Sequence, residues 1–115
     1  MLFRSDLTAS DAEEVLEKAG DAERLLIASP ATVTAGAARV FASKRLRLLG
    51  CEGQTVGPEE APMEVHLILL RQGIALLEGI VLDGVPEGRY FLSAAPLNLA
   101  GADGAPCRAF LIGEK

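Results

Sequence analysis

His66 and Glu78 are the two residues of this sequence with the clearest potential for chemistry. His66 lies within an apolar segment, and Glu78 directly follows another one. An ionisable group among apolar residues costs free energy unless it is paired, neutralised or bound to a metal. A neutral imidazole and a carboxylate are ordinary ligands of Zn²⁺, Mn²⁺ or Fe²⁺. The spacing alone favours the simpler alternative, which is a buried histidine hydrogen-bonded to a buried glutamate.

The sequence contains a single histidine, and this count limits the chemistry that one chain can perform. His66 would have to serve any Ser-His-Asp centre, and a metal site with several histidines from one chain is excluded. A metal hydrolase site typically needs three protein ligands and a water molecule, whereas we can name two. We therefore predict that the isolated chain binds Zn²⁺ or Mn²⁺ weakly or not at all.

Four further polar residues are candidates for contact with a substrate. Glu52, Gln54 and Thr55 lie in the glycine-rich loop 50–58 after an apolar strand, where polar groups often bind ligands. Arg108 follows a second glycine-rich loop and could hold a carboxylate with two parallel hydrogen bonds. The alternatives, a plain connection and a solvated arginine, are the more common outcome for such patterns.

Helices and strands must position these residues, and the spacing of apolar residues predicts both. Ser10 and Glu13 form a capping box that predicts the start of the first helix, and Gly20 predicts its end. The third helix is apolar on most sides, so we expect it to be deeply buried. We predict helices at 11–19, 35–44 and 62–72. We predict strands at 24–28, 46–49, 74–77, 89–95 and 107–112.

The order of these elements predicts an α/β fold. Helices and strands alternate early in the chain, which favours parallel strands, and the strand-rich end favours an antiparallel or mixed extension. The chain has 115 residues, of which 50% are hydrophobic and 4% aromatic. This composition predicts a single domain, residues 1–115, with an aliphatic core.

Charge and cysteine usage argue against several classes of function. The net charge is −5 and the basic residues are scattered, so we expect no nucleic-acid partner. No apolar run approaches the roughly 20 residues of a membrane span, and we identify no secretory leader, so we expect no membrane association. Cys51 and Cys107 lie far apart without activating groups nearby. They are predicted to be reduced, buried core residues of a cytoplasmic protein.

Residues 46–113 contain several short motifs in a characteristic order. The order is a Gly-acid-polar loop, a helix with one histidine, Leu-Glu-Gly, Pro-Glu-Gly-Arg-Tyr, a Pro-Leu bend, Gly-Ala-Asp-Gly and Pro-x-Arg-Ala. In this order they resemble the cyclase-like metal-dependent hydrolases, the family that includes bacterial kynurenine formamidase. Residues 6–43 match more loosely. The resemblance implies a swivelling β/β/α fold, in which helices pack against a mixed sheet.

The resemblance also assigns roles to residues. The family equivalents of His66 and Glu78 are metal ligands, which raises the ligand interpretation above what spacing alone allows. The family's other ligands and its catalytic histidine lie in an N-terminal half with a His-x-Gly-Thr-His-x-Asp motif, which this sequence does not contain. We therefore expect a truncated domain that resembles the C-terminal half of the family.

Three functions follow as hypotheses. The first, which we favour slightly, is a non-catalytic binding or assembly domain whose uncovered apolar surface forms a homodimer. The second is one half of a two-chain amide or ester hydrolase, in which a different subunit supplies the missing ligands. The third is a hydrolase that works alone by adding Glu52 or Asp103 to the site, and we rank it last.

Overall fold

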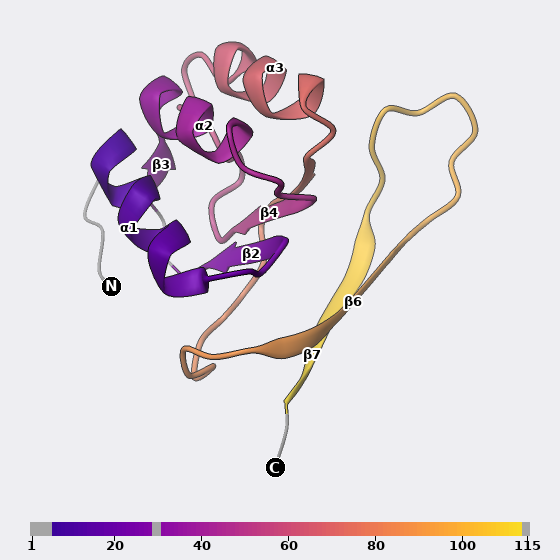
Figure 1. The fold of residues 1–115 in the computed structure, drawn as a ribbon. Helices are drawn as coiled ribbons and strands as arrows, with labels where there is room; N and C mark the ends of the chain where they lie inside the picture. Colours follow the sequence, from indigo (N-terminus) through magenta and orange to yellow (C-terminus); the bar gives the residue numbers. More distant parts are fainter. Residues whose placement is uncertain (1–5, 29–30, 114–115) are drawn as a thin grey trace. The chain divides into compact units, whose positions relative to one another are not determined.

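The computed structural model describes residues 6–28 and 31–113 and divides the chain into two compact units, residues 1–83 and 84–115 (Figure 1). The helices and strands that the sequence predicts are all present, with bounds within two residues of those expected. Within the described ranges, no helix is long and apolar enough to cross a lipid bilayer.

The first unit is organised around a three-stranded parallel sheet. Across the sheet, the strands are β2 (Arg24–Ile27), β4 (Leu48–Cys51) and β5 (Ala75–Leu77). In the central strand, Leu49 pairs with Leu25 on one side and with Leu76 on the other. The parallel pairing expected from the alternation of helices and strands is therefore confirmed.

A second parallel pair joins two strands that the sequence analysis did not predict. These strands are β1 (Asp6–Leu7) and β3 (Thr32–Val33). With two residues each, they are too short to produce a repeating apolar pattern. Leu7 and Val33 nevertheless belong to the core, because both are almost completely buried.

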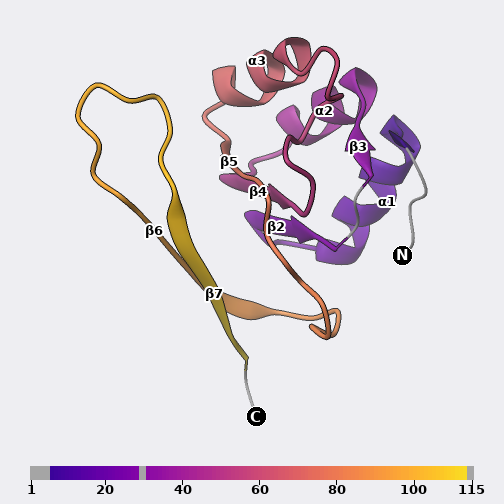
Figure 2. The ribbon, with the colours of Figure 1, turned by 180° about the vertical axis from the view of Figure 1, so that it is seen from behind.

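Three helices accompany the sheets of the first unit. They are α1 (Ala9–Ala19), α2 (Ala35–Ala42) and α3 (Met63–Arg71). The second helix packs against both of the others, and it lies between them in both views (Figures 1 and 2). The core beneath them is aliphatic, as predicted, apart from the buried ring of Phe41.

The first helix begins two residues earlier than the sequence pattern predicts. The capping box is formed by Thr8 and Asp11, not by Ser10 and Glu13. The Thr8 hydroxyl oxygen accepts from the Asp11 backbone N–H at 3.2 Å, and the Asp11 carboxylate accepts from the Thr8 N–H at 3.0 Å. At the other end, Gly20 has a φ of 62° and terminates the helix as predicted.

The prediction that α3 is deeply buried is wrong. Val65 and Leu69 are buried, but Met63, Leu67 and Leu70 are 66%, 39% and 53% exposed. The helix is apolar around most of its circumference, whereas the first unit covers only one side of it. The sequence pattern alone does not show which side of an apolar helix lacks a neighbour.

The second unit is an antiparallel hairpin of β6 (Tyr90–Pro96) and β7 (Cys107–Gly113). Phe91 pairs with Ile112, and Ser93 pairs with Phe110. The three large apolar side chains of these pairs are 65%, 54% and 49% exposed, in the order Phe91, Ile112, Phe110. The α/β class is confirmed, with the parallel and antiparallel strand pairs in separate sheets.

Candidate functional site

The candidate site lies where two neighbouring parallel strands end. Strand β4 ends at Cys51 and β5 ends at Leu77. The carboxyl ends of adjacent parallel strands meet at one edge of the sheet, which is the usual place for a ligand in such folds. The loop after β4 carries Thr55, the residue after β5 is Glu78, and α3 brings His66 to the same place.

His66 and Glu78 are in direct contact. His66 Nε2 lies 3.1 Å from Glu78 Oε2, and their side chains are 26% and 28% exposed. The hydrogen bond that the sequence analysis considered is therefore present, but the two side chains are half-buried rather than buried. Partial exposure leaves room for a ligand to approach the pair from solvent.

Thr55 and Val56 complete the group of residues around this pair. The Thr55 hydroxyl oxygen lies 3.3 Å from His66 Nε2, and the Val56 backbone N–H donates to Glu78 Oε2 at 2.6 Å. Thr55 is a substrate contact predicted from the sequence, whereas the Val56 N–H was not predicted. A backbone donor carries no residue-type signal, so only the loop geometry reveals it.

Backbone hydrogen bonds fix Glu78 at this edge of the sheet. After β5, the Gly79 N–H donates to the Gly53 carbonyl at 2.8 Å, and the Ile80 N–H donates to the Cys51 carbonyl at 3.2 Å. The chain after Glu78 thus runs along the start of the loop after β4. This pairing holds the Glu78 carboxylate next to the Val56 N–H.

Close packing of Gly57 fixes the other end of the same loop. A Cβ atom at this position would lie 3.0 Å from Val65 Cβ and 3.2 Å from Pro62 Cα. Glycine therefore allows the loop to approach the first turn of α3, the helix that carries His66. Any side chain at position 57 would push the loop and the helix apart.

The shared nitrogen atom excludes one type of catalysis. In a nucleophile–His–acid triad, the nucleophile and the acid bond to opposite nitrogens of the imidazole ring, so that one nitrogen accepts the nucleophile's proton while the acid orients the ring through the other. Thr55 Oγ1 and Glu78 Oε2 both lie next to His66 Nε2. This arrangement does not allow His66 to activate Thr55 while Glu78 orients the ring.

Cys51 is also unsuited to act as a nucleophile or thiolate ligand. Burial first, and then the negative charge of Glu78, raise the pKa of the Cys51 thiol from 9.0 to about 11. The residue is 3% exposed and belongs to the core, as predicted. Cys107 is half-buried on β7, so the prediction that it is buried is wrong.

The remaining candidate residues do not join the pair. Glu52 Oε2 accepts from the Leu82 N–H at 3.3 Å and so binds the chain after β5. Gln54 is exposed in the same loop. Arg108 and Asp103 belong to the second unit, where both are exposed. Their assignment as substrate or metal residues stays a prediction.

The donor atoms at the site fit a divalent cation only in part. An imidazole nitrogen and a carboxylate oxygen 3.1 Å apart could share one ion, because each ligand atom lies about 2.0–2.2 Å from Zn²⁺. Among residues 6–28 and 31–113, however, no three His, Cys, Asp or Glu side chains group closely enough to hold a metal. The described part of the chain therefore provides two neighbouring ligands, one fewer than a hydrolytic metal site needs.

Comparison with solved structures identifies close neighbours in fold. A potential metal-dependent hydrolase with cyclase activity superposes with a TM-score of 0.81 and 30% identity over 96% of this chain and 62% of the neighbour. A predicted metal-dependent hydrolase from Bacillus stearothermophilus gives a TM-score of 0.80 and 29% identity, over 96% of this chain and 60% of the neighbour. This chain has the fold of the cyclase-like metal-dependent hydrolases. The resemblance predicted from the sequence is confirmed.

Comparison with curated sequences gives relatives named kynurenine formamidase. The one from Maricaulis maris is 44% identical over 72 residues, which cover 62% of this chain and 34% of that protein. The one from Polaromonas naphthalenivorans is 42% identical over 84 residues, which cover 72% of this chain and 35% of that protein. The chain thus spans about a third of the length of these relatives. No family model matches it.

Proposed function

We propose that this cyclase-like, kynurenine formamidase-like domain is a binding and assembly module that does not catalyse hydrolysis by itself. The observation that carries the proposal is the incomplete donor set. His66 and Glu78 are two ligands of the type that a divalent metal requires, and the described residues offer no third one beside them. A hydrolytic metal site needs three protein ligands and an open position for water.

The other reactive groups at the site support the same proposal. Thr55 and Glu78 both lie next to Nε2 of His66, so this nitrogen is not free to take a proton from the Thr55 hydroxyl. The Cys51 thiol keeps its proton at neutral pH, because its pKa is raised to about 11. Neither residue offers a nucleophile that could replace a metal-activated water molecule. A cytoplasmic location, where thiols stay reduced, fits both cysteines.

Metal titration tests this proposal directly. Calorimetric titration of the purified chain with Zn²⁺ and with Mn²⁺ is expected to show weak binding or none, and aryl formamides and aryl esters are expected to remain intact. Variants His66→Ala and Glu78→Gln are compared with Glu59→Gln, which changes an exposed carboxylate outside the site. Sub-micromolar, stoichiometric uptake that is lost in His66→Ala and kept in Glu59→Gln would contradict the proposal.

The alternative function is one half of a two-chain metal-dependent amide or ester hydrolase. It is favoured by the chemistry of the pair, because the contact between an imidazole and a carboxylate already provides two neighbouring ligands. A second subunit would add the remaining ligands, and the bound metal would supply an activated water molecule. Metal uptake and hydrolysis should then appear only after mixing with that subunit, and both should disappear in His66→Ala.

Assembly is the part of the proposal that the exposed apolar residues support. Large apolar side chains are exposed on α3 and on the hairpin. Such groups are commonly covered by a partner, and a homodimer is the most frequent arrangement. Light scattering is expected to give a mass above that of the 12.1 kDa chain at high concentration. A monodisperse monomer at every concentration would count against assembly.

A further inference from the structure

The exposed apolar residues of α3 form a stripe along one face of the helix. We call Met63, Leu67 and Leu70 the α3 stripe. Their spacing of four and then three positions places them on one side of the helix. They are 66%, 39% and 53% exposed, whereas Val65 and Leu69 on the other side are buried. A helix with apolar residues on both sides is typical of one that is covered on both sides.

Two opposite charges accompany the stripe. Glu64 lies in the first turn of α3 and Arg71 in the last turn, seven positions apart, so that both lie on the same side of the helix. Glu64 pairs with Arg39 of α2 at 3.2 Å, in a contact where both side chains are largely exposed. Among residues 6–28 and 31–113, Arg71 has no ion pair.

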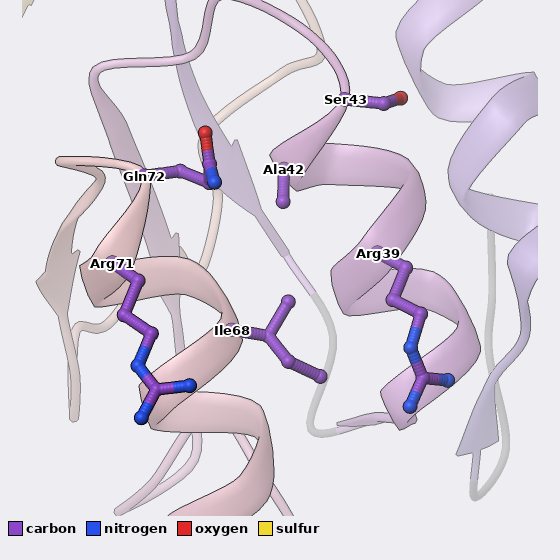
Figure 3. A pocket seen from close by; sticks show the side chains of 6 residues that line it. All are labelled: Arg39, Ala42, Ser43, Ile68, Arg71 and Gln72. Carbon is purple, nitrogen blue, oxygen red and sulfur yellow. The ribbon is translucent and has the colours of Figure 1, made fainter.

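The groove between α2 and α3 shows how these charges are presented. Figure 3 shows Ile68 pointing from α3 toward α2, with the guanidinium groups of Arg39 and Arg71 on either side of it. The groove is open, and Arg71 is exposed beside it. An additional carboxylate near Arg71 would therefore form an ion pair without displacing Glu64 from Arg39.

We propose that α3 pairs antiparallel with α3 of a second copy of this chain, about a two-fold axis close to Leu67. This inference rests on the assembly role proposed above. The axis brings the two α3 stripes together and places Glu64 of each copy next to Arg71 of the other. Each copy of α3 thus contributes the acidic residue to one ion pair and the basic residue to the other. This makes the helix surface self-complementary only when the two helices run antiparallel.

The size of the surface predicts a weak dimer. A helix of nine residues is about 13 Å long, so two such helices bury less area than a standard stable interface. We therefore expect a dissociation constant on the order of micromolar, with subunits that exchange rapidly. Sedimentation velocity over protein concentrations from about 1 to 500 µM covers this range.

Substitutions in the α3 stripe test whether it forms the interface. We expect Leu67→Glu and Leu70→Glu each to raise the dissociation constant at least about 30-fold, because each places a charge in an apolar contact. The matched control is Val81→Glu, which changes an apolar residue that is 76% exposed and lies outside α3. It should change the constant by less than about twofold. Circular dichroism verifies that each variant is folded.

Charge reversal tests whether the two helices run antiparallel. It changes residues that are already exposed, so the fold of each chain should tolerate it. Glu64→Arg and Arg71→Glu each bring like charges together across the axis, and each should raise the dissociation constant about tenfold. The double variant restores opposite charges and should return to within about threefold of the original chain. A helix that packs parallel, or against a different surface, gives no such recovery.

The outcomes separate this inference from the proposed function. A dimer that is unaffected by the stripe and charge variants overturns the α3 pairing but leaves the assembly role intact. A chain that stays monomeric throughout the concentration range overturns both. A monomer whose free energy of unfolding falls in Leu67→Glu would show that the α3 stripe is covered within one chain, and this also overturns the pairing.

Discussion

Phe41 in the first unit and Phe91 in the hairpin are the same residue type in opposite surroundings. Phe41 of α2 is completely buried in the core of the first unit, whereas Phe91 is 65% exposed on β6. Parallel strands need crossover connections, and the helices in those connections cover the sheet. A hairpin of two strands has no such cover of its own and is at best marginally stable alone. The comparison teaches that topology, more than composition, decides how much apolar surface a segment buries.

Matched substitutions of these two phenylalanines should give the largest difference. We expect Phe41→Ala to lower the free energy of unfolding by about 3–5 kcal/mol, because it leaves a cavity in the core. Phe91→Ala should lower it by less than about 1 kcal/mol, because the ring is mainly in contact with water. Urea unfolding followed by circular dichroism measures both. Equal losses of unfolding free energy in the two variants would contradict this difference, since they would require the exposed hairpin face to be covered in solution.

The two cysteines extend the comparison to alkaline pH. The unfolded Cys51 thiol ionises near pH 9.0, but the folded thiol keeps its proton up to a pKa of about 11. The unfolded state therefore loses its proton first, and the free energy of unfolding falls as the pH rises through this range. The loss should reach about 2 kcal/mol near pH 11.

Urea unfolding at several pH values between 8 and 11 measures this effect. The contribution of Cys51 is the difference in pH dependence between the original chain and Cys51→Ala, with Cys107→Ala as the control from the hairpin. Cys51→Ala should remove the extra loss above pH 9, and Cys107→Ala should retain it. An unchanged pH dependence in Cys51→Ala would mean that this thiol does not titrate as its burial implies.

Two glycines extend the comparison to the loops. Gly57→Ala should cost about 1–3 kcal/mol, because the new Cβ would crowd Val65 and Pro62 at the start of α3. Gly104→Ala, in the loop of the hairpin, has no atom within 4 Å of the added Cβ and should stay within about 0.5 kcal/mol. Thermal unfolding of both variants would show whether close packing is confined to the loop beside the site. A large loss in Gly104→Ala would contradict that difference.

Most elements of this fold were predictable because they carry a repeating apolar pattern. The start of α1 was not, since Thr8 with Asp11 and Ser10 with Glu13 both match a capping box and only the folded chain selects one. The short strands β1 and β3 were missed because two residues cannot show an alternation.

The candidate site was predictable in its side chains but not in its backbone. His66 and Glu78 were identifiable as ionisable residues in apolar segments, and the structure brings them into contact. The Val56 N–H was not identifiable, because every residue except proline has one. The exposure of α3 was also missed, since it depends on which neighbours the fold places beside an apolar helix.

Val56 links the two parallel sheets of the first unit through its own peptide groups. Its carbonyl accepts from the Val33 N–H at 2.9 Å, and its N–H donates to Glu78 Oε2. A cation that took this oxygen would compete with the hydrogen bond of a buried amide, which is costly to leave unpaired. Ion capture through Oε2 would therefore weaken a contact that orders the 52–57 loop, which couples the order of this loop to the occupancy of that one oxygen.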